Sequence, residues 1–139
     1  MLHAKRLIFF CLLSCSMNAN AWWETAHMMV CDKAYELLTP SALEIVDPLI
    51  KVHESFGRSC LWADWIKAED RIDTRSWHYI NLPDIEQNIY TAKCPVNGCL
   101  ISSFHEQIEI LKDESASARQ KQEALWFIGH FVGDIHQPM

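Results

Sequence analysis

The chain has 139 residues, half of them hydrophobic, and its 18 acidic residues outnumber its 12 basic residues, which gives a net charge of −6. This length suits one domain of modest size. The acidic balance excludes a broad basic face for nucleic acid, so any phosphate group must be bound locally, with bound cations supplying the positive charge.

The first 21 residues have the three parts of a secretory signal peptide. Lys5 and Arg6 form a positive start, residues 7–13 form an apolar run too short to span a bilayer, and residues 19–21 (Ala-Asn-Ala) match a cleavage site. We therefore expect a secreted or periplasmic protein without stable membrane insertion, in which residues 22–139 form the N-terminal part of a single domain.

Six cysteines are present, and two of them lie in the predicted signal peptide. The remaining four are expected to form disulfides in an oxidising compartment. Cys94 and Cys99 bracket a tight loop and are the pair we expect, which leaves Cys31 with Cys60 among three possible connectivities. A cysteine-rich zinc site is the rival interpretation, and the lack of any C-x-x-C spacing argues against it.

The mature chain has helical periodicity and no alternating period-two runs, which predicts an all-α fold. Thr25 is expected to cap a first helix that runs to about Leu38. Thr39 and Pro40 should end it and begin a second helix, whose apolar stripe is disturbed at Pro48. The residues of this stripe are Leu43, Val46, Leu49 and Ile50.

The middle of the chain has weaker patterns. Residues 53–58 are expected to form a loop around Gly57, followed by a third helix over about residues 59–72. Residues 77–81 should be short and extended, and residues 82–99 should form a long irregular loop.

Two further helices complete the predicted fold. The fourth is marked by an apolar stripe, and the fifth runs from about Ser117 to Ile135. The stripe residues of the fourth are Ile101, Phe104, Ile108 and Leu111, and the buried line of the fifth is expected to be Leu125, Ile128 and Val132.

His130 and Asp134 lie four residues apart in the fifth helix, so their side chains share one face, one turn apart. An imidazole and a carboxylate so placed can bind a metal ion such as zinc. Gly129 and Gly133 beside them would let another element pack close to this face. Because such pairs also arise by chance, a half-buried polar patch is the alternative interpretation.

Three more residues are candidate ligands: His27, Asp64 in a Trp-Ala-Asp-Trp segment, and His78 in a Trp-His-Tyr segment. Each also has a plainer interpretation. His27 suits a hydrogen-bonded core histidine, Asp64 an ion pair with Lys67 on the next turn, and His78 a hydrogen bond to a backbone carbonyl. The tryptophans suit a hydrophobic core.

Taken together, these segments resemble the zinc-dependent S1/P1 nucleases, which are related to bacterial zinc-dependent phospholipase C. Their order and approximate spacing match along the whole mature chain, and the loop between Cys94 and Cys99 looks like a disulfide loop of that family. The matching segments are residues 22–27 (WWETAH), 62–64 (WAD), 77–81 (WHYIN) and 130–138 (HFVGDIHQP).

The resemblance implies a mainly helical fold with three Zn²⁺ ions, of which this chain supports at most two. The second zinc would be bound by His27 and by the α-amino nitrogen and carbonyl oxygen of Trp22, with Asp134 bridging it to the first. Two cations that share a carboxylate can activate water for in-line attack on phosphorus. The ligands implied for the first zinc are Asp64, His78, His130 and Asp134.

The resemblance also implies a substrate and its contacts. Tyr79 would stack on a base and Asn81 would hydrogen-bond it, while Lys67 stands where the family often has an arginine and would neutralise phosphate. Asp64 and Asp134 would be further catalytic residues. The implied enzyme is monomeric. It hydrolyses single-stranded DNA and RNA to 5′-nucleotides and has 3′-nucleotidase activity on 3′-nucleotides.

The chain departs from the family pattern at its end. The family's ligands of the third zinc begin four residues after the position of His136, beyond Met139, so we expect a fragment or a truncated gene product. His136 itself is expected to lie beside the cluster and not to be a ligand. The alternative functions are a phospholipase C, with a lipid headgroup in place of a base, and an inactive truncated chain.

Overall fold

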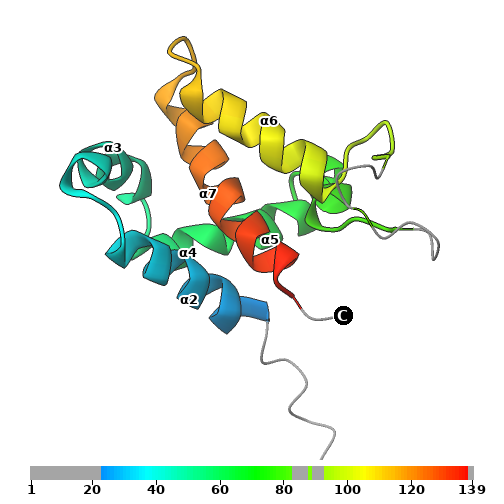
Figure 1. Cartoon of the computed structure of the whole chain (residues 1–139), viewed down its shortest axis with the longest axis horizontal. Coiled ribbons are helices and arrows are strands. Elements are labelled where there is room, and N and C mark those ends of the chain that lie inside the picture. Colours follow the sequence, from blue (N-terminus) through cyan, green and yellow to red (C-terminus); the bar gives the residue numbers. More distant parts are fainter. Residues whose placement is uncertain (1–22, 83–87, 89–92, 138–139) are drawn as a thin grey trace, which may run out of the picture.

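The computed structural model describes residues 23–82, 88 and 93–137, and these contain helices and no strand (Figure 1). The all-α prediction is therefore confirmed. The predicted signal peptide and Trp22 lie outside the described residues. The elements are α2 (Trp23–Glu36), α3 (Pro40–Ile50), α4 (Phe56–Cys60), α5 (Trp62–Ala68), the 3₁₀ helix η2 (Ile72–His78), α6 (Leu100–Lys112) and α7 (Ala118–Ile135).

Helix α7 is the centre of the fold. It contacts α2, α3, α4, α5 and α6, and Figure 1 shows it crossing between them. Several of the largest fully buried side chains come from α7, namely Trp126, Phe127, His130 and Phe131. A helix covered on several sides must present apolar groups over a wide arc, and α7 does so.

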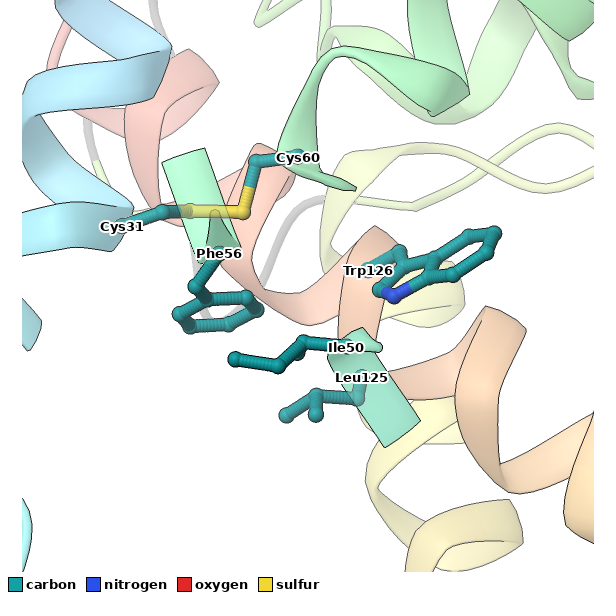
Figure 2. Packing of buried hydrophobic residues seen from close by; sticks show 6 residues of the cluster. All are labelled: Cys31, Ile50, Phe56, Cys60, Leu125 and Trp126. Atoms are coloured by element: carbon teal, nitrogen blue, oxygen red, sulfur yellow. A yellow bond between two sulfur atoms is a disulfide. The ribbon is translucent and has the colours of Figure 1, made fainter. Parts of the chain in front are cut away.

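The buried face of α7 differs from the predicted one. Leu125 is buried as expected, but Ile128 and Val132 are only half-buried. The predicted set of buried residues would suit a helix packed against one neighbouring surface, whereas α7 packs into two apolar clusters. Leu125 and Trp126 join Cys31, Ile50, Phe56 and Cys60 in one cluster (Figure 2), and Phe127 and Phe131 join Ala63, Ile66 and Leu100 in the other.

The first two helices follow the sequence closely. Helix α2 starts at Trp23, two residues before the expected cap at Thr25. Helix α3 starts at Pro40 as predicted, and the Thr39 hydroxyl accepts a hydrogen bond from the Ala42 amide at 3.3 Å. Helix α3 also continues through Pro48 to its last residue, Ile50.

The prediction for the middle of the chain is wrong in three places. Helix α4 occupies part of the expected loop at residues 53–58, because the Ser55 hydroxyl caps it by accepting a hydrogen bond from the Arg58 amide. The expected helix over residues 59–72 is split at Leu61 into α4 and α5. Residues 77 and 78 of the expected extended segment belong to η2, and the backbone becomes extended only at Tyr79.

Both expected disulfides are present. Cys31 of α2 is bonded to Cys60 of α4, and Cys94 is bonded to Cys99. The second pair closes a turn that contains Gly98, whose φ of +87° lies in the region that favours glycine. Within the part of the chain that the structure describes, no helix is both long and apolar enough to cross a bilayer.

Candidate metal centre

Five of the six predicted metal ligands come together in one cluster, and the sixth, Trp22, lies outside the described residues. Four separate elements supply the five side chains. Their nitrogen and carboxylate atoms form two overlapping groups that could hold a metal ion, with all ligand atoms of a group within 4.8 Å of one another. The groups are His27 with Asp64 and His130, and His78 with His130 and Asp134.

The carboxylate of Asp134 faces two sets of histidines. Its Oδ1 lies 3.1 Å from Nε2 of His27. Its Oδ2 lies 3.2 Å from Nδ1 of His78 and 3.3 Å from Nε2 of His130. A carboxylate that turns one oxygen to each side is arranged to be shared between two neighbouring cations.

Asp64 approaches the same cluster from α5. Its Oδ1 lies 3.5 Å from Nε2 of His130 and 3.6 Å from Nδ1 of His78. The Lys67 ammonium, one turn further along α5, donates a hydrogen bond to the same oxygen. The plainer interpretation of Asp64, an ion pair with Lys67, is thus also present in the structure.

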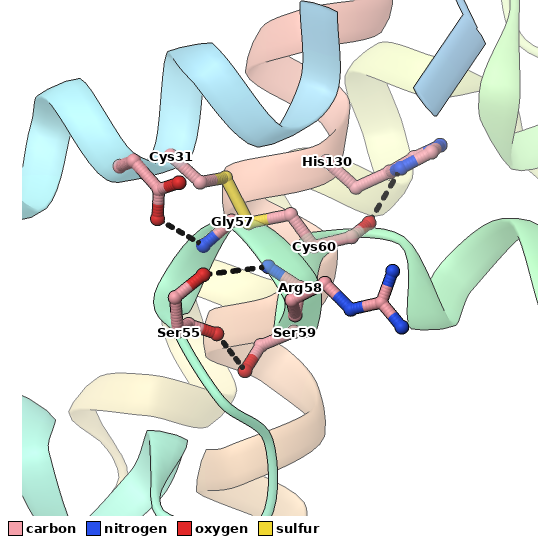
Figure 3. Close-up of a disulfide and its surroundings, with 8 residues drawn as sticks. Cys31, Ser55, Gly57, Arg58, Ser59, Cys60 and His130 are labelled. Atoms are coloured by element: carbon pink, nitrogen blue, oxygen red, sulfur yellow. Dashed lines mark hydrogen bonds between the residues drawn. A yellow bond between two sulfur atoms is a disulfide. The ribbon is translucent and has the colours of Figure 1, made fainter. Parts of the chain in front are cut away.

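His130 is held in a fixed orientation by the backbone of α4. It is completely buried, and its Nδ1 lies 2.7 Å from the carbonyl oxygen of Cys60 (Figure 3). Since a carbonyl only accepts, Nδ1 must carry the hydrogen, and Nε2 is turned toward the carboxylates. The ring of His27 stacks on the ring of His130, with centroids 4.1 Å apart.

The two glycines of α7 allow this close packing, as the sequence indicated. A Cβ atom at Gly133 would lie 2.6 Å from Cδ2 of His27. A Cβ atom at Gly129 would lie 2.5 Å and 2.6 Å from the Sγ atoms of Cys60 and Cys31. Any larger residue would therefore push α2 and α4 away from α7.

The carboxylates and imidazoles strongly perturb one another. Burial alone would raise the pKa of Asp64 and of Asp134, but hydrogen bonds from His130 and further partners hold both pKa values well below their usual range. Burial alone would lower the pKa of His130, but its bonds to Asp134 and Asp64 raise that pKa to about 9. For His78, burial dominates and lowers the pKa.

The donor set fits a bound divalent cation. Three imidazoles and two carboxylates converge, and such nitrogen and oxygen ligands suit zinc and similar ions. Such ligands bind a metal ion in their deprotonated form, so protons and a metal ion would compete for these side chains. In the described part of the chain, Nε2 of His78 is buried without a hydrogen-bond partner.

The predicted substrate residues lie beside the cluster, in a separate pocket of about 160 Å³. Tyr79 directly follows the buried His78 yet is 52% exposed. Lys93 also lines this pocket. It was not identified as a site residue from the sequence, because its position next to Cys94 is the only signal that the sequence offers. The pocket is lined by Ser76, Tyr79, Ile80, Asn81, Lys93, Pro95, Asn97, Gly98 and Cys99.

The disulfide loop at residues 94–99 forms one wall of this pocket. The side chains of Ser76 and Trp77 donate hydrogen bonds to the carbonyl oxygen of Asn97 at 3.1 Å and 3.2 Å. The Leu100 amide donates to the Tyr79 carbonyl at 3.0 Å. The loop is thereby fixed to η2 and to the start of α6.

His136 lies outside the cluster, as expected. Its side chain is exposed, and its Nδ1 lies 2.7 Å from the carbonyl oxygen of Val132 one turn earlier.

Comparison with known proteins agrees with this geometry. A family model described as S1/P1 Nuclease matches residues 22–139. Endonuclease 2 of Arabidopsis thaliana is 30% identical over 140 residues, which cover 92% of this chain and 48% of that protein. Nuclease P1 of Penicillium citrinum is 27% identical over 125 residues, covering 85% and 46%. Nuclease S1 of Aspergillus oryzae is 34% identical over 83 residues, covering 56% and 29%.

The chain thus spans about half the length of Endonuclease 2 and Nuclease P1. Because the family model covers every residue after the predicted signal peptide, the chain belongs to the S1/P1 nuclease family.

Proposed function

We propose that this chain carries the N-terminal half of the active site of a zinc-dependent nuclease. The complete enzyme would hydrolyse single-stranded DNA and RNA to 5′-nucleotides and remove the phosphate of 3′-nucleotides. The observation that carries the proposal is the convergence of five imidazole and carboxylate side chains, each at most 8% exposed and from four elements, in a chain of this family.

The residues divide into two adjacent zinc positions. One would be held by Asp64, His78 and His130, and the other by His27 and the N-terminal Trp22, with Asp134 shared by both. When bound, zinc supplies Lewis-acid stabilisation of phosphate charge and lowers the pKa of water. The split orientation of the Asp134 carboxylate supports this division.

The protein side chains have their own tasks. Asp134 and Asp64 keep the histidines oriented, and the Cys60 carbonyl holds the proton of His130 at Nδ1. Lys67 lies at the edge of the cluster, with a quarter of its side chain exposed. Once a metal ion takes the oxygen of Asp64, the Lys67 ammonium would be available to pair with a substrate phosphate.

The pocket at Tyr79 would take a base of the substrate. The half-exposed ring of Tyr79 offers a face for stacking, and the amide of Asn81 offers both a donor and an acceptor. Stacking on a ring tolerates any base, which suits a nuclease of low sequence preference.

The predicted signal peptide and the two disulfides support a secreted or periplasmic location. The enzyme is proposed to act as a monomer.

The proposal is tested by measuring zinc per chain on protein that begins at Trp22, together with hydrolysis of single-stranded DNA, a 3′-nucleotide and phosphatidylcholine. We expect two zinc ions, and any hydrolysis should be directed at the nucleotides and stop with a chelator. Zinc binding with cleavage of phosphatidylcholine would favour the phospholipase alternative. Absence of zinc would contradict the proposal.

Residues added before Trp22 provide a matched variant. They remove the free α-amino group, whose pKa of about 8 lets it bind a metal at little cost. We expect the extended protein to bind one zinc ion fewer, while a C-terminal extension of the same length leaves the zinc content unchanged.

A further inference from the structure

The Cys31–Cys60 disulfide lies directly behind the metal centre. Cys31 is one helical turn after His27 on α2, and Cys60 is four residues before Asp64. Both cysteines are fully buried (Figure 2), and both sulfur atoms lie against Gly129, the residue before His130. One covalent bond thus joins α2, which carries His27, to α4, which precedes the Asp64-bearing α5, beside Gly129 of α7.

The backbone of Cys60 contacts a ligand directly. Its carbonyl oxygen accepts the hydrogen bond from Nδ1 of His130 at 2.7 Å (Figure 3). His130 is completely buried, so solvent offers no replacement for this acceptor. The position of one carbonyl group therefore decides where Nε2 of His130 points.

The helix that carries this carbonyl cannot hold itself in place. Helix α4 has only five residues, and a single turn of helix is unstable in isolation. Two bonds tie it to α2: the disulfide, and the hydrogen bond that the Gly57 amide donates to Oδ1 of Asp32 at 2.7 Å. Both ties come from consecutive residues of α2, so they hold α4 to α2 at one place, in addition to the packing of α4 on α7.

We propose that Cys31–Cys60 is a positioning pair for the metal centre, in addition to cross-linking the fold. By anchoring α4 to α2, it holds the Cys60 carbonyl at Nδ1 of His130 and so presets Nε2 toward Asp64 and Asp134. This inference rests on the proposed function, because it takes the cluster to be a metal centre. It assigns the disulfide an effect on metal affinity that a remote cross-link does not have.

The chain contains its own control. The Cys94–Cys99 disulfide closes a loop whose neighbours are Ser76, Trp77 and the Tyr79 pocket. It closes this loop and does not tie down α4, the helix that carries the Cys60 carbonyl. Removal of this disulfide tests the loss of a cross-link without loss of the Cys60 anchor.

The decisive experiment compares three proteins that begin at Trp22: the unaltered chain, the Cys31→Ser/Cys60→Ser variant and the Cys94→Ser/Cys99→Ser variant. Zinc affinity is measured by competition with a chromophoric chelator, at a temperature where circular dichroism shows equal helix content. Loss of a group that orients a metal ligand typically costs 10- to 100-fold in affinity. We expect a loss of about that size in the first variant and less than about 3-fold in the second.

A second measurement needs no metal. In the metal-free protein, the hydrogen-bonded Nδ1 proton of His130 should give a slowly exchanging, downfield NMR signal. The signal should be retained in the Cys94→Ser/Cys99→Ser variant and lost or broadened in the Cys31→Ser/Cys60→Ser variant. If the unaltered chain bound no zinc, the proposed function would fail, while this signal would still decide whether the disulfide positions His130.

Gly129→Ala decides the matter if the Cys31→Ser/Cys60→Ser variant does not fold. It keeps all ligands and all cysteines, but its Cβ would lie 2.5 Å from Sγ of Cys60 and displace the pair. Zinc affinity should fall in the same range. The inference would be overturned by a folded variant in which the Cys31–Cys60 disulfide is absent or displaced, but zinc affinity and the His130 signal are both unchanged.

Discussion

His78 and Tyr79 are neighbours in the chain, yet they belong to regions that are built in different ways. The side chain of His78 is almost completely buried in the metal centre, where its partners come from α5 and α7, up to 56 residues away. Tyr79 is half-exposed in a pocket formed by one short segment and the disulfide loop that follows it. The metal centre therefore depends on how the whole bundle packs, and the pocket depends on local structure.

Because the two regions are built differently, substitutions in the metal centre and in the pocket should have different effects. A change at the contacts between α2, α4 and α7 should alter metal binding wherever it is made. A change in the pocket should alter nucleotide binding and leave the metal in place.

Asp134→Asn should have the largest effect, because Asp134 is the residue shared by both proposed zinc positions. Loss of a group that only orients a ligand costs about 10- to 100-fold in metal affinity, so loss of this ligand should cost at least about 100-fold. Asp73→Asn is the matched control, since Asp73 is exposed and pairs with Arg71. Zinc titration of both proteins checks the prediction, and equal affinities would show that Asp134 is not a ligand.

Gly133→Ala should disturb the metal centre without replacing any of its proposed ligands. The added Cβ would lie 2.6 Å from the His27 ring, which is already stacked on His130. Overpacking of this kind costs about 1–3 kcal/mol, against a gain of up to about 1 kcal/mol in helix propensity. Denaturant unfolding should therefore show a net loss of up to about 2 kcal/mol, and zinc analysis should show loss of the zinc ion bound by His27.

His136→Ala is the control for Gly133→Ala. It lies at the same end of α7, but its side chain is exposed, and its Nδ1 lies 2.7 Å from the Val132 carbonyl oxygen. Zinc content and stability should stay close to those of the unaltered chain. A loss of zinc here would mean that the cluster extends further along α7 than its five residues.

The meeting of the five cluster residues could be predicted from the sequence because each lies in a short segment that resembles the S1/P1 nucleases. His130 and Asp134 are one turn apart on a long periodic helix, and Gly129 and Gly133 beside them indicated the close packing that the structure shows. Helix α3 was equally clear, since Thr39 caps it and Pro40 begins it.

Helix α4 could not be predicted, because the residue that looked like a loop signal has another role. Gly57 lies inside α4, and a Cβ there would lie 2.5 Å from the Asp32 carboxylate, to which the Gly57 amide donates. The requirement for glycine comes from a contact 25 residues away and not from the backbone conformation. A five-residue helix also has too few turns to show periodicity.

Lys67→Met should affect the binding of zinc and the binding of phosphate differently. The Lys67 ammonium donates to Oδ1 of Asp64, so it competes with a metal ion for that oxygen. Its removal should leave zinc affinity unchanged or raise it. Affinity of the zinc-loaded protein for inorganic phosphate should fall about 10- to 150-fold, since a hydrogen bond to a charged group contributes about 1.5–3 kcal/mol. Lys67→Arg should restore phosphate binding, and a parallel loss of zinc and phosphate would show that Lys67 only supports Asp64.

Tyr79→Ala should have the smallest effect on the protein and a selective effect on the substrate. Loss of a stacking ring costs about 1–3 kcal/mol per base, so affinity for a mononucleotide should fall about 5- to 100-fold. Tyr79→Phe keeps the ring and should bind nearly as tightly. Zinc content and stability should stay unchanged in both variants, because the side chain is half-exposed and its backbone carbonyl still accepts from the Leu100 amide. Loss of zinc in Tyr79→Ala would show that the pocket and the metal centre are one coupled unit, and the separation drawn from His78 and Tyr79 would then be wrong.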